Sequence, residues 1–277
     1  MPDSLTAAQL IAEKYKDDGE EVVNTYLNLG FSKHIALMRE HMGLISGTKV
    51  LDIGCGTGAL LVELCQAGAE VTGIDTFEEA GGIDRRIAQS RLKEKGLVAK
   101  LIAGTASDIP SGNDAYDLVI TIGMLEHIPP TIRPEMLREM FRVVKPGGYL
   151  FLIAGPTKAT PFDQHIPGHP FSNWLSRERK QQVSEKAGRR QFLEVPWGIS
   201  RGELRQALPE GEFNNLYAVY FSQCGGQTGG EFSWKPLSML VWMKRRFKLH
   251  RFFGLAATVL YFLHQEHCHI LAIRKVT

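Results

Sequence analysis

The chain has few cysteines, and their arrangement argues against a disulfide-stapled fold. Four cysteines occur among 277 residues, and no two of them form a C-x-x-C pair. One of them, Cys55, lies in a glycine-rich segment where a disulfide would obstruct a ligand. We therefore expect a protein of a reducing compartment and predict a cytoplasmic location.

Strong charge of one sign and an export signal are also missing. Lys and Arg number 32 against 30 Asp and Glu, and no long basic block precedes the carboxyl-terminal third. This balance argues against nucleic acid as a partner. The first ten residues contain an early acid and no long apolar core, so we expect no signal peptide.

Residues 49–60 are the most informative segment, because they read as a buried strand, a glycine turn and a helix. Gly54, Gly56 and Gly58 follow the apolar run at every second position. The NAD fingerprint needs G-x-G-x-x-G, and no Gly-Lys-Ser/Thr follows to hold a phosphate. The pattern predicts a loop whose backbone contacts a nucleoside, although such a loop can also merely turn a strand into a helix.

A second strand is expected at residues 71–75, and it ends in Asp75. A carboxylate at this place accepts two hydrogen bonds from a ribose diol in doubly wound folds. The alternative is that Asp75 caps the next helix. Further strands are expected at 99–103, at 116–121 and after a two-glycine turn at 145–148.

These segments resemble, in their order, the class I S-adenosylmethionine (SAM)-dependent methyltransferases with a seven-strand Rossmann-like fold. The run from Val50 to Gly58 is similar to the first motif of that family, and residues 122–128 are similar to its L-E-H segment. The motifs come closest to the ubiquinone-pathway O-methyltransferase-like group. The resemblance implies an α/β, doubly wound, mostly parallel seven-stranded sheet with helices on both faces and an antiparallel last strand. Residues 216–221 and 270–274 would be its last two strands.

The resemblance also implies the cofactor and the residues that hold it. SAM would be bound, and S-adenosylhomocysteine would be the product. Thr105 stands where the family most often has Asp, so the adenine contacts are the least defined. The implied cofactor-binding residues are Asp52, Gly54, Cys55, Gly56, Asp75, Thr76, Thr105, Ala106, Ser107, Gly123 and Met124.

Four parts of the chain are expected. Residues 1–47, with two helical patterns, would cap the pocket; 48–222 would be the SAM-binding core; 223–266 an insertion or lid; and 267–277 the final strand of the core. Tyr15 and Tyr26 in the cap could contact the ligand or simply pack. The segment 234–263 joins a basic run to an apolar stretch, so peripheral membrane contact and a homodimer are both open.

Three histidines are candidates for the catalytic base: His169, His165 and His127. A histidine suits deprotonation of a hydroxyl near neutral pH. The competing interpretations are surface or capping histidines for the first two and a loop-fixing role for His127. Glu126, His127 and His169 could also hold a divalent ion, but Gly123 replaces the first glutamate of the related metal-binding pattern, and we predict no metal.

The sequence therefore predicts a SAM-dependent methyltransferase that acts on a small molecule, through a hydroxyl that belongs to a hydrophobic or lipid-like acceptor. A C- or N-methyltransferase of a small metabolite is one alternative. A noncatalytic SAM-binding regulatory or scaffold protein is the other. The intact Asp52, glycines and Asp75 favour catalysis.

Overall fold

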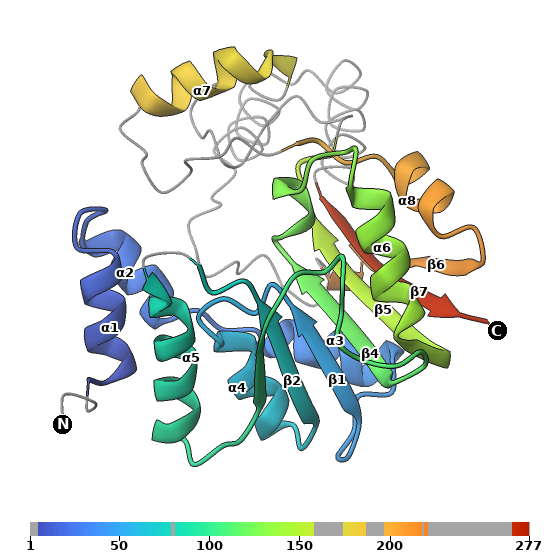
Figure 1. The fold of residues 1–277 in the computed structure, drawn as a ribbon, viewed down its shortest axis with the longest axis horizontal. Helices are drawn as coiled ribbons and strands as arrows, with labels where there is room; N and C mark the ends of the chain where they lie inside the picture. Colours follow the sequence, from blue (N-terminus) through green and yellow to red (C-terminus); the bar gives the residue numbers. More distant parts are fainter. Residues whose placement is uncertain are drawn as a thin grey trace, which may run out of the picture.

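The computed structural model describes residues 5–78, 81–157, 174–186, 197–217, 219–220 and 268–276. Within these segments a seven-stranded sheet has the order β3-β2-β1-β4-β5-β7-β6 (Figure 1). The first five strands run parallel, and β7 is antiparallel to both of its neighbours. The strands are β1 (Lys49–Ile53), β2 (Glu70–Asp75), β3 (Lys100–Ala103), β4 (Tyr116–Ile122), β5 (Val144–Ala154), β6 (Gly211–Asn215) and β7 (His269–Lys275).

The strand order reverses between β1 and β4. The chain winds from β1 outward through β2 to β3, and then crosses back to β4 on the other side of β1. Ile53 of β1 pairs with Ile74 of β2 and with Thr121 of β4, so the three strands end at nearly the same level. A crevice at the carboxyl ends of these strands is the usual ligand site of a doubly wound sheet.

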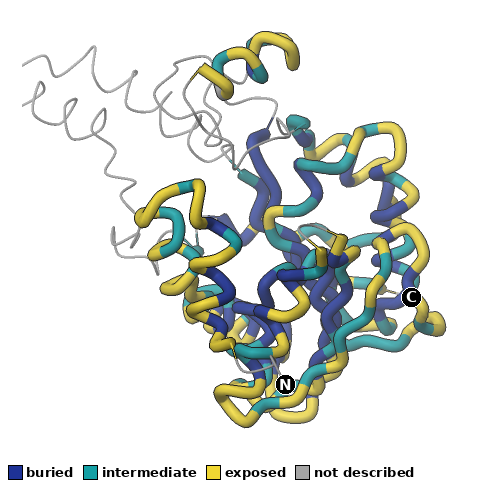
Figure 2. The backbone as a smooth tube through the Cα atoms, turned by 60° about the vertical axis from the view of Figure 1, so that its left-hand side comes forward, coloured by how far each residue is buried: buried dark blue, intermediate teal, exposed yellow. Residues whose placement is uncertain are grey.

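Helices cover both faces of the sheet, as predicted. One face buries Val119 and Leu152 against α6 and α8, and the other buries Leu118 and Phe151 against α3 and α4. Figure 2 shows the buried strands inside and the more exposed helices around them. The helices are α1 (Ala7–Lys14), α2 (Glu20–Leu27), α3 (Ser32–His41), α4 (Ala59–Gln66), α5 (Ile83–Glu94), α6 (Arg133–Arg142), α7 (Arg177–Lys186), α8 (Arg201–Ala207) and the 3-10 turn η2 (Leu125–His127).

The amino-terminal region contains three helices where the sequence predicted two. α1 begins with a capping box between Thr6 and Gln9. α3 has Phe31 at its N-cap and no side-chain cap, so it lacks the usual start signal. Burial of Ile35 and Met38 against the sheet stabilises α3 instead.

The sixth strand is not where the sequence predicted it. β6 is the polar edge segment Gly211–Asn215, while the apolar residues 216–221 were expected to form the strand. The Asn215 side chain accepts a hydrogen bond from the Tyr217 N–H at 3.1 Å, and the Tyr220 N–H reaches the Leu216 carbonyl at 2.8 Å. The second of these is a helical contact, so the strand prediction for 216–221 was wrong at the described residues Tyr217, Val219 and Tyr220. The strand at 270–274 is confirmed within β7.

The two-glycine turn predicted at 145–148 lies inside β5. Pairing with β4 shifts register between Tyr116 and Leu118, and the extra residues are accommodated there. Gly147 has a φ of +80°, which suits this irregularity. The strand therefore begins before the turn that was expected to precede it.

The predicted division of the chain stays a prediction. The insertion at 223–266, the segment 234–263 and Cys224 lie outside the described residues. In the part of the chain that the structure describes, no helix combines the length and apolar character needed to cross a membrane. The three described cysteines, Cys55, Cys65 and Cys268, are free thiols.

Candidate functional site

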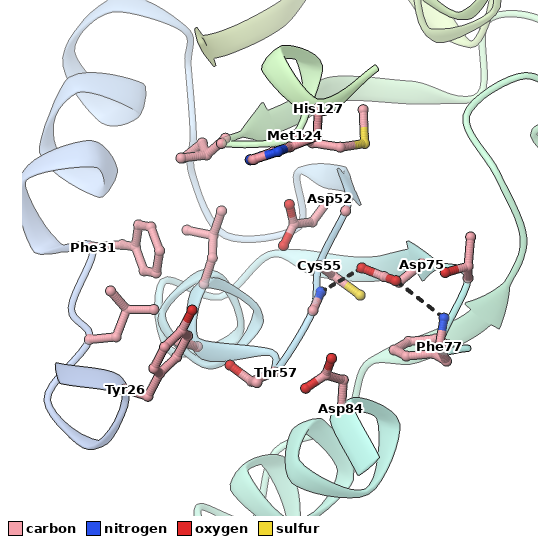
Figure 3. Close-up of a pocket in the computed structure, with 18 of the residues that line it drawn as sticks. Tyr26, Phe31, Asp52, Cys55, Thr57, Asp75, Phe77, Asp84, Met124 and His127 are labelled. Atoms are coloured by element: carbon pink, nitrogen blue, oxygen red, sulfur yellow. Dashed lines mark hydrogen bonds between the residues drawn. The ribbon is translucent and has the colours of Figure 1, made fainter. Parts of the chain in front are cut away.

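A cavity of about 450 Å³ lies at the carboxyl ends of β1, β2 and β4 (Figure 3). Its floor is the loop between β1 and α4, and α1, α2 and the start of α3 border its other side. The lining residues are Lys14, Tyr15, Tyr26, Leu29, Phe31, Asp52, Gly54, Cys55, Gly56, Thr57, Ala59, Leu60, Asp75, Thr76, Phe77, Asp84, Ile122, Gly123, Met124 and His127.

The glycine loop exposes backbone to this cavity. Gly56 has a φ of +48°, and a Cβ placed on it would meet nothing within 4 Å, so the space beside it is open. Gly58 has a φ of +74°, but a Cβ there would lie 2.7 Å from the Ala88 Cβ of α5. Gly56 thus leaves room for a ligand, whereas Gly58 allows α4 and α5 to approach closely.

Asp75 holds the glycine loop from the end of β2. One carboxylate oxygen accepts the Gly56 N–H at 2.9 Å, and the other accepts the Phe77 N–H at 3.2 Å (Figure 3). Each oxygen can accept a further hydrogen bond, which a ribose diol would supply. The N-cap of α5 is Gly82 without a side-chain bond, so Asp75 does not cap that helix.

Asp52 brings a second carboxyl group to the cavity. Its side chain is only 3% exposed. Burial, and then the nearby Asp75, raise its pKa to about 7. Burial likewise raises the pKa of the Cys55 thiol, so Cys55 is a protonated wall of the cavity and not a nucleophile.

The amino-terminal helices close one side of the cavity. The sequence left open whether Tyr15 and Tyr26 contact the ligand or simply pack. They stack with their ring centroids 4.1 Å apart, and both line the cavity. The Lys14 ammonium contacts both Asp84 carboxylate oxygens, at 2.6 and 2.7 Å, and so ties α1 to α5. Lys14, Asp84 and Phe31 were not predicted as site residues, because no motif marks them and only the fold brings them together.

The segment after β4 forms the remaining wall. Gly123 and Met124 line the cavity as predicted, and His127 of η2 lies at its edge beside Met124 (Figure 3). His165 and His169 lie outside the described residues. Within the described segments, no group of three His, Cys, Asp or Glu side chains could hold a metal ion.

The three residues predicted at the adenine do not line the cavity. Ala106 is buried in the hydrophobic core, and the hydroxyl oxygens of Thr105 and Ser107 lie 2.8 Å apart on the exposed side of their loop. Their role in binding adenine stays a prediction.

Comparison with known proteins agrees with the geometry. Residues 50–148 match the family model described as a methyltransferase domain. The open glycine loop and the Asp75 carboxylate would fit the nucleoside of S-adenosylmethionine.

Curated relatives of the methyltransferase domain include two kinds of protein. An uncharacterized methyltransferase from Synechocystis is 34% identical over 54% of this chain and 61% of its own length. A ubiquinone biosynthesis O-methyltransferase from Bordetella avium is 36% identical over 41% of this chain and 45% of its own length. The matched part of the chain therefore spans less than two thirds of the length of these relatives.

Two solved structures share the fold of the described residues. A Haemonchus contortus phospholethanolamine N-methyltransferase, in complex with S-adenosylhomocysteine, is 16% identical with a TM-score of 0.56. It covers all of this chain and 62% of its own. The [4+2]-cyclase SpnF is also 16% identical, with a TM-score of 0.50 over 98% of this chain and 97% of its own.

Proposed function

We propose that this protein transfers a methyl group from S-adenosylmethionine to a small-molecule acceptor at the cavity beside the glycine loop. The observation that carries the proposal is the Asp75 carboxylate. It is fixed by the Gly56 and Phe77 amides and lines the cavity.

The cavity suits a cationic ligand. Lys14, the one lysine among the described lining residues, is paired with Asp84. The carboxyl groups of Asp52 and Asp75 are therefore not balanced by a lysine of the lining. Asp75 would hold the ribose, and the glycine loop with Asp52 would lie along the amino-acid end. When bound, S-adenosylmethionine supplies an electrophilic methyl group on a cationic sulfur.

The acceptor would lie between the aromatic cap and η2. Tyr26, Leu29 and Phe31 give this side an apolar surface, which favours a hydrophobic acceptor. His127 is the described residue best placed to take a proton from a hydroxyl. The name of the Bordetella relative, an O-methyltransferase, supports a hydroxyl as the accepting group.

The direct test of the cofactor assignment is calorimetric titration with S-adenosylmethionine and S-adenosylhomocysteine. Wild-type protein should bind both. The Asp75 carboxylate accepts hydrogen bonds from two backbone N–H groups, and in Asp75→Asn the side-chain NH₂ would face one of these donors. The affinity for both ligands should therefore fall about 100-fold. The matched control is Asp114→Asn, because Asp114 pairs with Lys275 away from the cavity and Asn tolerates its φ of +57°. Equal affinity of Asp75→Asn and wild type would remove Asp75 from the site.

N-methylation is a second candidate, since the Haemonchus structure with the same fold is an N-methyltransferase. A screen of phenols, alcohols and amines separates the two candidates, and His127→Gln then tests the base. A hydroxyl acceptor needs a base, so kcat should fall by about 10²-fold or more while S-adenosylhomocysteine affinity stays. Unchanged kcat would mean that His127 is not the base.

A further inference from the structure

Arg133 is a charged side chain in an unusual place. It is the first residue of α6 and is only 1% exposed, which makes it one of the largest fully buried side chains of the described segments. A buried guanidinium is costly unless it is paired and hydrogen-bonded. At this position the Arg133 guanidinium therefore needs hydrogen-bond acceptors and a negative charge close by.

The partners of Arg133 belong to two different elements. One terminal nitrogen donates to the Ile128 carbonyl at 2.8 Å, directly after η2. The other lies 3.3 Å from Glu203 Oε1 of α8. The second oxygen of Glu203 accepts the Ser200 N–H at 2.9 Å in the α8 capping box, so this carboxylate is itself held in place.

The η2 turn is also held from its other side. The Glu126 carbonyl accepts the Trp197 N–H at 2.6 Å, and the Glu126 side chain is 3% exposed. Burial lowers the pKa of Arg133, while the negative charges of Glu203 and Glu126 oppose that shift and keep the guanidinium charged. His127 thus lies between two residues, Glu126 and Ile128, that are both fixed through buried contacts.

We propose that Arg133 is a positioning residue that fixes the η2 turn, and with it His127, at the edge of the cavity. The part of this inference that concerns His127 as a base rests on the proposed function. The competing explanation is that Arg133 only joins α6 to α8 through Glu203. The Ile128 contact distinguishes the two, because it acts on the turn and not on α8.

Amide hydrogen exchange on the full chain tests this without any cofactor. The reporters are the His127 and Ile128 amides, which donate to Met124 and Leu125 carbonyls within the turn. Arg133→Met keeps the apolar stem and removes the donors, so these two amides should exchange about tenfold faster or more, while Ile120 in β4 keeps its protection. Arg133→Lys keeps the charge but not the planar fork and should raise exchange about threefold.

The control is Arg138→Met, which removes an exposed arginine from the same helix and should leave the turn unchanged. Arg133→Lys decides the question if Arg133→Met does not fold. The proposal would be overturned if, in the variant that folds, the His127 and Ile128 amides exchange as slowly as in wild-type protein. Faster exchange that is confined to α8 would also overturn it.

S-Adenosylhomocysteine then separates this inference from the proposed function. In wild-type protein it should shift the NMR signals of the His127 ring, and in Arg133→Met or Arg133→Lys this shift should shrink by about half or more at saturation. An undiminished shift would refute the positioning of His127. Failure of wild-type protein to bind S-adenosylhomocysteine would refute the proposed function, while the exchange data would still decide the role of Arg133.

Discussion

At the residue scale, the two carboxyl groups at the ends of β1 and β2 differ because their surroundings differ. Asp75 receives two backbone N–H donors, whereas Asp52 is buried and close to Asp75. Desolvation and a neighbouring negative charge both disfavour ionisation. Asp52 therefore takes up a proton near neutral pH, and a bound cation would favour its ionised form.

This leads to a prediction about stability and pH. The pKa of Asp52 is raised from 3.8 to about 7 in the folded chain, so its contribution to stability is fully present below about pH 3.8 and is lost as pH rises from there through about 7. Asp52→Asn removes the buried charge. Urea unfolding should show the variant about equal to wild type below about pH 4 and progressively more stable as pH rises to about 7, by about 4 kcal/mol near pH 8. A difference that does not change with pH would contradict the raised pKa.

The sequence identified some site residues and missed others, for a physical reason. Asp52, Gly54, Gly56 and Asp75 belong to local patterns, because strand ends and glycine turns are set by short stretches of chain. Lys14 and Asp84 are separated by 70 residues and meet only after α1 docks on α5. No local pattern marks such a pair.

At the scale of elements, the parallel core was predictable and the edges were not. Buried strands such as β1 and β4 are mostly apolar, and a glycine follows each of them. β6 is an edge strand with a polar sequence, and the more apolar residues after it turn into helical structure. Packing against β7, not strand propensity, decides which segment joins the sheet.

The two glycines that follow Cys55 in the loop make separable contributions to the junction of β1 and α4. In Gly58→Ala the new Cβ would meet the Ala88 Cβ at 2.7 Å and its Cα at 2.9 Å. Together with the left-handed φ, this should lower the free energy of unfolding by about 2–4 kcal/mol. Gly56→Ala has the strained φ without a clash and should cost about 1 kcal/mol in the same urea titration. Equal losses would show that helix contact at Gly58 is unimportant.

At the scale of the whole molecule, the cavity is built from segments far apart in sequence. The core supplies Asp52, Asp75 and His127, and the amino-terminal helices supply Tyr26 and Phe31. Several long-range contacts join these parts, among them the Lys14 pair with Asp84 and an Arg91 guanidinium that donates to the Tyr26 carbonyl at 2.6 Å. A ligand in the cavity would contact both parts, so binding should stabilise the docked amino-terminal helices.

The central claim is that this cavity binds S-adenosylmethionine through Asp75 and the glycine loop. A crystal structure of the chain with S-adenosylhomocysteine tests it most directly. The account predicts both ribose hydroxyls within hydrogen-bond distance of the Asp75 carboxylate and the amino-acid end beside Gly54 and Gly56. Density for the ligand elsewhere, or a ribose without contact to Asp75, would contradict it.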